Sequence, residues 1–256
     1  MNTVNSPQDA KIIIQKLPSD MGIHRNPRKG TLDAPDRILE GLEFERDVFI
    51  DEVFPNEFDL AETHSRILEN TLELAEYSKP IISIGGDHSV SYPVVKALKE
   101  SNPELKLVWL DSHLDVKEKV QDHNSHDVIV RQMVEEDLFD PKEIYFVGIT
   151  EIDHDEEDFL EENEFNFYRP EELDCFLQDF EGEAYLSIDI DVLRAEVAPG
   201  TGYPDGKLNL EQVLEVVRGV EPEDSDIVEV APSLDNKGKT VEASRKILER
   251  IISNIS

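Results

Sequence analysis

The sequence contains little cysteine, few basic residues and no long apolar run. Cys175 is the only cysteine among 256 residues, so an intrachain disulfide is excluded and a reducing, cytoplasmic compartment is expected. A lone cysteine typically behaves as a buried small hydrophobe, and we expect this of Cys175. No stretch approaches the roughly 18 consecutive apolar residues of a membrane-spanning helix. The first ten residues have neither the basic start nor the apolar run of a secretory signal.

Positive charge is scarce relative to negative charge. The chain has 25 Lys and Arg residues against 58 Asp and Glu residues, a formal net charge of −33. Because Lys and Arg bind phosphate groups, we expect neither a nucleic acid nor an anionic membrane as a partner. Two explanations of the acidity stay open: adaptation of the surface to high salt, which we favour, and attraction of a cationic substrate. Against salt adaptation, the 14 lysines are not depleted relative to the 11 arginines.

Short apolar runs alternate with longer amphipathic stretches along the chain. Runs rich in Ile, Val, Phe and Leu predict strands at residues 11–17, 47–53, 80–85, 105–111, 143–149, 165–168, 184–190 and 226–232. Helical spacing of apolar residues predicts helices at about 57–77, 89–100, 127–138, 171–180, 209–219 and 238–254. This alternation indicates a mostly parallel sheet with helices on both faces. With no repeat or linker in sight, we predict one α/β domain over residues 1–256, a three-layer αβα sandwich.

Ionisable residues follow four of the predicted strands, where an apolar strand does not need them. In open parallel sheets the carboxyl ends of the strands share one edge, and ligands bind there. The four strand ends therefore predict a single crevice that contains seven ionisable side chains: His88, Asp111, His113, Asp115, Asp189, Asp191 and Glu229.

The spacing of these residues favours a metal site. Asp111, His113 and Asp115 alternate, so they face one side if the strand continues, and without a cation their carboxylates would repel each other. Taken singly, His88 also fits a turn, and Asp-x-Asp at 189–191 fits a loop cap or a generic Mg²⁺ site. Four carboxylates and two imidazoles without a thiolate favour a hard ion over structural zinc. Six ligands are too many for one catalytic ion, so we predict two ions about 3.5–4 Å apart, with Mn²⁺ as the first choice, that activate a water for hydrolysis.

Three ordered motifs resemble the signatures of the ureohydrolase superfamily, which contains arginases, agmatinases and formiminoglutamases. The motifs are Gly-Gly-Asp-His at 85–88, Asp-x-His-x-Asp at 111–115 and Ser-x-Asp-x-Asp at 187–191, and the similarity extends from about residue 10 to 254. It includes Ala-Pro-Gly-Thr-Gly at 198–202. The resemblance implies an arginase-like fold and a binuclear manganese hydrolase of a guanidino compound, in which a metal-bridging hydroxide attacks. It implies one metal held by His88, Asp111, Asp115 and Asp189 and a second held by His113, Asp111, Asp189 and Asp191.

The resemblance also implies roles for residues outside the metal ligands. His126 matches the family's active-site histidine, which passes protons to the leaving amine; a surface loop residue is the alternative, and His123 is a competing candidate. Glu229 matches the carboxylate that anchors the guanidinium. With the metal ligand Asp115, His126 and Glu229 are the predicted catalytic residues. The family's assembly implies a homotrimer or homohexamer. The remaining histidines match no family position, and we expect them at the surface: His24, His64 and His154.

The sequence departs from the family pattern near the substrate pocket. Arg194 and Ala195 stand where the family usually has an Asp-Pro pair. Tyr203 replaces a threonine after the Gly-Thr-Gly turn. Thr150-Glu151 follow the strand predicted at 143–149, where many members carry Arg. None of these changes affects a predicted metal ligand.

The predicted substrate-pocket residues are Asn124, Arg194, Tyr203 and Glu229. Agmatine, hydrolysed to putrescine and urea, is the first substrate hypothesis, because its far amine suits acidic surroundings. If the substrate is arginine or another guanidino acid, Arg194 would pair with its carboxylate. A formimino compound, a deacetylase substrate and a non-catalytic metal-binding protein are further alternatives.

Overall fold

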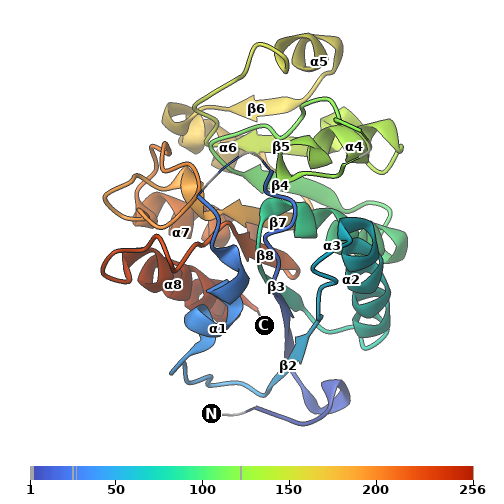
Figure 1. Ribbon diagram of the computed structural model, residues 1–256, viewed down its shortest axis with the longest axis vertical. Coiled ribbons are helices and arrows are strands. Elements are labelled where there is room, and N and C mark those ends of the chain that lie inside the picture. Colours follow the sequence, from blue (N-terminus) through green and yellow to red (C-terminus); the bar gives the residue numbers. More distant parts are fainter. Residues whose placement is uncertain (1–2, 25, 27, 122, 256) are drawn as a thin grey trace.

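The computed structural model describes residues 3–24, 26, 28–121 and 123–255, which contain eight strands in one sheet. The strand order is β2-β1-β3-β8-β7-β4-β5-β6, and every pair is parallel (Figure 1). The strands are β1 (Ile12–Leu17), β2 (Val48–Glu52), β3 (Ile81–Gly85), β4 (Lys106–Leu110), β5 (Ile144–Val147), β6 (Asn166–Tyr168), β7 (Ala184–Asp189) and β8 (Ser225–Val228). Each overlaps its predicted range, and β8 ends four residues early because Glu229 turns away from the sheet with a φ of 59°.

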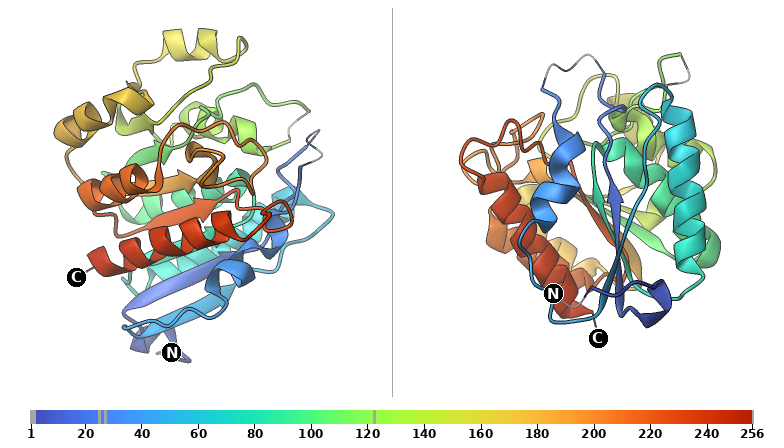
Figure 2. Two further views of the ribbon diagram at one scale, coloured as in Figure 1. Left: turned by 90° about the vertical axis from the view of Figure 1, so that its left-hand side faces the viewer. Right: turned by 60° about the horizontal axis from the view of Figure 1, so that its bottom comes forward.

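The sheet lies between two layers of helices (Figure 2). Residues of α1 (Ala34–Leu39), α6 (Leu173–Asp179), α7 (Leu210–Val220) and α8 (Lys239–Asn254) join the core on one face. Residues of α2 (Leu60–Ala75), α3 (Ser91–Ser101) and α4 (Ile129–Glu135) join the core on the other, and α5 (Glu157–Glu162) packs at its margin. The predicted three-layer αβα fold is confirmed, with the sheet parallel throughout. The two helices that were not predicted, α1 and α5, have six residues each.

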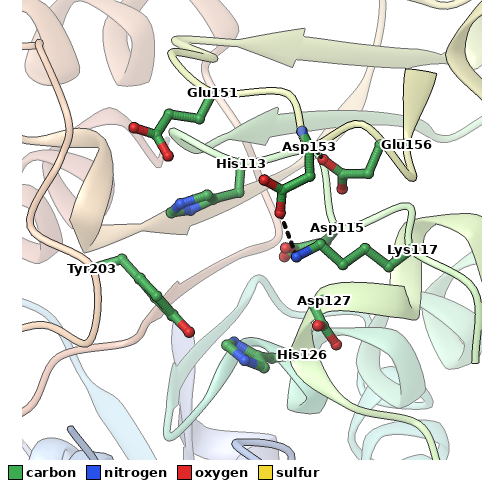
Figure 3. Close-up of a pocket in the computed structure, with 9 residues that line it drawn as sticks. All are labelled: His113, Asp115, Lys117, His126, Asp127, Glu151, Asp153, Glu156 and Tyr203. Carbon is green, nitrogen blue, oxygen red and sulfur yellow. Dashed lines mark hydrogen bonds and ion pairs between the residues drawn. The ribbon is translucent and has the colours of Figure 1, made fainter. Parts of the chain in front are cut away.

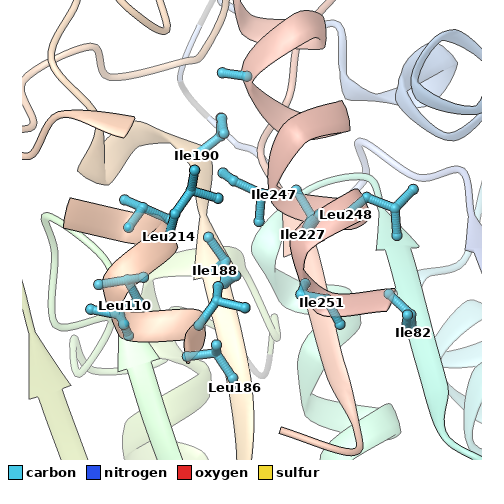
Figure 4. Packing of buried hydrophobic residues seen from close by; sticks show 14 of the residues in the cluster. Ile82, Leu110, Leu186, Ile188, Ile190, Leu214, Ile227, Ile247, Leu248 and Ile251 are labelled. Carbon is cyan, nitrogen blue, oxygen red and sulfur yellow. The ribbon is translucent and has the colours of Figure 1, made fainter. Parts of the chain in front are cut away.

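Apolar cores cover both faces of the sheet, which explains why several of the strand sequences are continuous apolar runs. Along β1, Ile12 and Ile14 belong to the core under α7 and α8, whereas Ile13 and Leu17 belong to the core under α2 and α3. Figure 4 shows the first core, in which α7 and α8 present Leu and Ile side chains to the central strands. Two covered faces make the sheet a rigid base for the loops at its edge.

Two predictions about single residues are wrong. Cys175 is exposed, because α6 buries Leu173 and Phe176 and turns the two residues between them toward solvent. His64 is buried, because it shares the inner face of α2 with Ile67. His154 is exposed as predicted, and His24 is partly buried. In the described residues no helix has the length and apolarity that crossing a membrane requires.

Candidate metal centre and active site

Four adjacent central strands carry the predicted ionisable residues to one edge of the sheet. β3, β8, β7 and β4 are neighbours in this order, although β8 follows β3 by about 140 residues in the sequence. Their carboxyl ends lead into His88, Glu229, Asp189 and Asp111 respectively. The backbone joins two of these ends directly, because the Glu229 amide donates to the Gly86 carbonyl at 2.9 Å.

The Gly-Gly-Asp-His segment is shaped by close backbone contact. A Cβ atom on Gly86 would lie 1.8 Å from the carbonyl oxygen of Ser19, so only glycine fits there. Asp87 faces away from the ligand residues: its carboxylate accepts hydrogen bonds from the amides of Gly22 and Ser89, both at 3.0 Å. These contacts fix the turn that directs His88 into the centre.

The first ligand group surrounds His88. Its Nδ1 atom lies 3.1 Å from Asp111 Oδ2, 3.3 Å from Asp189 Oδ2 and 3.4 Å from Asp115 Oδ2. His88, Asp111 and Asp115 offer donor atoms close enough to bind one ion. All four side chains are buried. These are the four residues that the family resemblance implies for one metal.

The second group surrounds His113 and shares Asp111 with the first. His113 Nδ1 lies 3.0 Å from Asp191 Oδ2 and 3.4 Å from Asp111 Oδ1. Asp111 therefore has one oxygen in each group, as a bridging ligand needs. Asp189 Oδ1 accepts a hydrogen bond of 2.7 Å from the backbone amide of Asp191, which links the two aspartates of the third motif.

The charges of these side chains fit divalent cations. Burial, together with the charges of Asp191 and Asp111, raises the pKa of Asp189 well above its ordinary value. Burial and the charge of Asp111 also raise the pKa of Asp115. Burial opposes protonation of His88, but the negative charges of Asp111, Asp115 and Asp189 beside its ring outweigh it and raise its pKa well above the usual range. His88 Nδ1 and Asp111 Oδ2 are buried and have no hydrogen-bond partner among the described residues, so both are available as ligand atoms.

Residues beneath His88 fix its orientation, and the sequence did not reveal them. Its ring stacks on Trp109 with centroids 3.8 Å apart and planes inclined by 5°. Its Nε2 atom lies 2.8 Å from Ser187 Oγ, which donates its proton to Asp226 Oδ1 at 2.8 Å. The Ser187 oxygen must therefore accept from Nε2–H, so in the neutral ring Nδ1 carries the lone pair that a metal requires. Tyr185 also donates to Asp226, at 2.7 Å.

His126 and Glu229 lie together beside the centre. His126 Nδ1 is 3.2 Å from Glu229 Oε1, which also accepts the amide of His88 at 2.9 Å. Burial opposes protonation of His126, but the hydrogen bond and the charge of Glu229 raise its pKa to about 9. Asp115 and Glu229 both have left-handed backbones, with φ of 55° and 59°. This conformation costs on the order of 1–3 kcal/mol for a residue other than glycine and is concentrated at functional sites.

A cavity of about 280 Å³ opens beside these residues (Figure 3). Its lining includes four of the predicted site residues: His113, Asp115, His126 and Tyr203. Five further ionisable residues line it that the sequence did not assign to the site: Lys117, Asp127, Glu151, Asp153 and Glu156. Three of them, Glu151, Asp153 and Glu156, lie in the loop after β5, and the strand-end rule applied to β5 could have found this loop.

Asn124 and Arg194 lie elsewhere in the described part of the chain. Asn124 lines a separate hollow with Met21 and Phe58, and Arg194 lines another with Lys207. Arg194 is held there because its Nε donates to the Lys207 carbonyl at 2.6 Å and its backbone pairs with Asp205. The structure therefore places neither residue in the cavity beside the metal ligands. His123 shares the hollow of Asn124, whereas His126 lines the cavity, so of the two competing histidines His126 is the one beside the candidate metal ligands.

Comparison with known proteins gives the family. The sequence profile of the arginase family matches residues 10–253. The chain belongs to the arginase family. An agmatinase from Bacillus subtilis is 30% identical over 270 residues, which cover 96% of this chain and 92% of that protein. A guanidinobutyrase from Pseudomonas aeruginosa is 31% identical over 214 residues, 75% of this chain, and the match spans about two thirds (65%) of that relative's length.

Solved structures of the arginase family share the fold. The agmatine ureohydrolase of Thermoplasma volcanium superposes with a TM-score of 0.83 at 22% identity, covering 98% of this chain and 92% of that one. The formiminoglutamase of Trypanosoma cruzi with Mn²⁺ gives a TM-score of 0.86 at 17% identity, covering 98% and 95%. The sheet and the strand ends that carry the ligand groups are therefore the family fold.

Proposed function

We propose that this protein hydrolyses agmatine to putrescine and urea at a binuclear manganese centre. As an arginase-family hydrolase it acts on a carbon–nitrogen bond of a linear amidine. The observation that carries the proposal is the pair of histidine–carboxylate groups joined by Asp111 beside a cavity lined by carboxylates. Carboxylate and imidazole ligands without thiolate are the set that suits Mn²⁺.

Six residues would hold the two ions: His88, Asp111, His113, Asp115, Asp189 and Asp191. When bound, the ions supply a water that is acidic enough to attack at neutral pH. Binding requires the protons of His88 and His113 to leave, because the surrounding carboxylates raise the pKa of both rings against the effect of burial.

His126 supplies the proton for the leaving amine. An amine leaves poorly unless it is protonated, and His126, with its pKa raised to about 9, carries a proton at neutral pH. Its Nδ1–H donates to Glu229, which leaves Nε2–H as the proton for the amine. Glu229 thereby positions His126. Its further role as the anchor of the guanidinium remains a prediction, since one of its oxygens is already engaged by His88 and His126.

The cavity supports a substrate with a cationic far end. Asp127, Glu151, Asp153 and Glu156 line it, and the one lysine in the lining, Lys117, is paired with Asp153 at 2.5 Å. Burial raises the pKa of Glu156 to about 7, so an ammonium group nearby would favour its ionised form. These charges favour the amine of agmatine over the carboxylate of a guanidino acid. A guanidino acid is the second candidate, because the 31%-identical relative is a guanidinobutyrase.

Urea release from agmatine, arginine and 4-guanidinobutyrate by Mn²⁺-loaded protein tests the proposal. We expect the highest kcat/KM for agmatine, and complete loss of activity after EDTA treatment that added Mn²⁺ reverses. A preference for 4-guanidinobutyrate would select the second candidate. Urea from none of the three would contradict both.

A further inference from the structure

Tyr203 is a large aromatic side chain at the mouth of the cavity. It is 42% exposed, one of few large apolar residues in the described chain with so much open surface. It follows Gly200-Thr201-Gly202, where the ureohydrolase pattern has a threonine. Tyr203 also lines the cavity, so its exposed ring is open to contact with a bound ligand.

The turn that carries Tyr203 is held firmly. Arg28 donates from Nε to the Gly202 carbonyl and from Nη2 to the Thr201 carbonyl, both at 3.0 Å. The Gly200 amide donates to Thr240 Oγ1 at 2.8 Å, and its carbonyl accepts from the Ala231 amide at 2.7 Å. The ring is therefore presented by a braced turn.

The ring lies beside both the candidate metal ligand His113 and the proposed proton donor His126. Its centroid lies 5.5 Å from that of His113, with the planes at 68°, and 6.3 Å from that of His126, with the planes at 22°. Figure 3 shows it reaching from its loop into the space beside these two histidines. A cation within about 6 Å of an aromatic centroid is attracted by the ring, and a reacting group between His113 and His126 lies in that range.

We propose that Tyr203 binds the substrate's guanidinium against the face of its ring. A guanidinium is planar, delocalised and weakly hydrated, so it stacks on aromatic rings better than an ammonium does. A threonine offers one hydroxyl at this position, whereas the tyrosine offers a flat face, which suits an amidinium head group of this shape. The inference rests on the proposed function and assigns this residue to the reacting end of the substrate.

Two substitutions separate the ring face from the hydroxyl. Tyr203→Phe keeps the face, and Tyr203→Leu keeps an apolar side chain without it. Phe54→Leu is the matched control, because Phe54 is 70% exposed and is not among the described residues that line the cavity. Because Tyr203 is itself exposed, neither change at this site removes core packing, and thermal unfolding of each variant checks this.

We measure KM and kcat for agmatine with Mn²⁺-loaded protein. Calorimetry with the same protein gives the Kd of guanidinium chloride, at millimolar concentrations that do not denature the protein. For Tyr203→Leu we expect KM and Kd to rise about 3- to 30-fold, with a smaller change in kcat. Tyr203→Phe should retain most of the binding that Tyr203→Leu loses, and the control should stay near wild type.

Unchanged guanidinium binding in Tyr203→Leu would overturn the inference, as would an equal loss in Tyr203→Phe, which would assign the effect to the hydroxyl. If wild-type protein released no urea from any guanidino compound, the proposed function alone would fail. The guanidinium titration needs no turnover, so it would still decide the role of Tyr203.

Discussion

Replacing Ser187 with alanine tests whether the residues beneath His88 prepare it for metal binding. Ser187 is fully buried on β7, and its oxygen is the acceptor 2.8 Å from His88 Nε2. Alanine removes this acceptor and leaves Nε2–H without a partner in a dry environment. An unsatisfied buried donor costs about 1–3 kcal/mol. The serine proton that constrained the ring to the Nε2–H form is also lost.

Only part of this cost appears in metal affinity. His88 keeps its contact with Ser187 in the metal-free protein too, so the loss of the hydrogen bond also lowers the free energy of unfolding of that form. Substitutions of residues that orient a metal ligand typically weaken metal binding by about 10- to 100-fold. We expect one of the two metal sites, the one at His88, to weaken by this factor while the other changes less.

A competition titration against a chromophoric chelator measures both metal affinities, and urea denaturation measures the stability of the metal-free protein. Ser225→Ala is the matched control. Ser225 is fully buried on the neighbouring strand β8, and its hydroxyl has no hydrogen-bond partner within the described chain. Metal affinities of Ser187→Ala within twofold of wild type would refute the reasoning, and so would an equal loss in the control.

Three further predictions concern proton transfer, buried charge and salt. His126→Ala should lower kcat by about 10²- to 10⁴-fold without changing metal content, because it removes the proton donor; unaffected urea release with normal metal content would contradict that role. Burial raises the pKa of Asp224 from its ordinary value of 3.8 to about 6 in the folded protein. The buried charge therefore lowers the free energy of unfolding increasingly as the pH rises from 3.8 to 6. Asp224→Asn keeps an acceptor for the Ile81 amide. It should raise the free energy of unfolding by about 1–3 kcal/mol at pH 8 and by about half as much at pH 5. If urea denaturation at pH 8 shows no increase in the free energy of unfolding, the charge is well solvated. Raising KCl from 0.1 M to 1 M should raise Tm by screening the net charge of −33, and a lower Tm would count against salt adaptation.

The sequence predicts β3, β4, β5 and β7 well because each is buried and mostly apolar, whereas β2 and β6 are half-buried strands that their Val, Ile, Phe and Tyr residues reveal. The short helices α1 and α5 escape such patterns, since six residues make fewer than two turns and show no period. His64 was misplaced although the signal existed: Leu60, His64, Ile67, Thr71 and Leu74 recur at helical spacing along one face of α2. The residue type alone predicts a surface position for His64, but its place on the inner face of α2 buries it.

The clustering of the candidate metal ligands was predictable because the strand-end rule and the three motifs agree on these residues. The supporting residues were not singled out, although two carried a signal: Ser187 belongs to the third motif, and Asp226 is a charged residue in a predicted strand. Trp109 carried none, because an apolar residue inside a strand needs no functional explanation. Arg194 shows that closeness in the sequence does not ensure closeness in space. Arg194 is only three residues from Asp191 in the sequence, but the Lys207 carbonyl accepts a hydrogen bond from its Nε and holds its guanidinium in a different hollow.

The position of β8 has a consequence for synthesis of the chain on the ribosome. β8 is the last strand in sequence order, yet it pairs with β3 on one side and β7 on the other. Until it emerges, the sheet consists of two separate halves, one carrying His88 and the other carrying Asp111, His113, Asp115, Asp189 and Asp191. A nascent chain can therefore bring Asp111, His113 and Asp191 together before β8 is inserted, whereas the proposed ligand group around His88 needs β8 in place. Metal binding at the proposed His88 site would thus report that the central strand has been inserted.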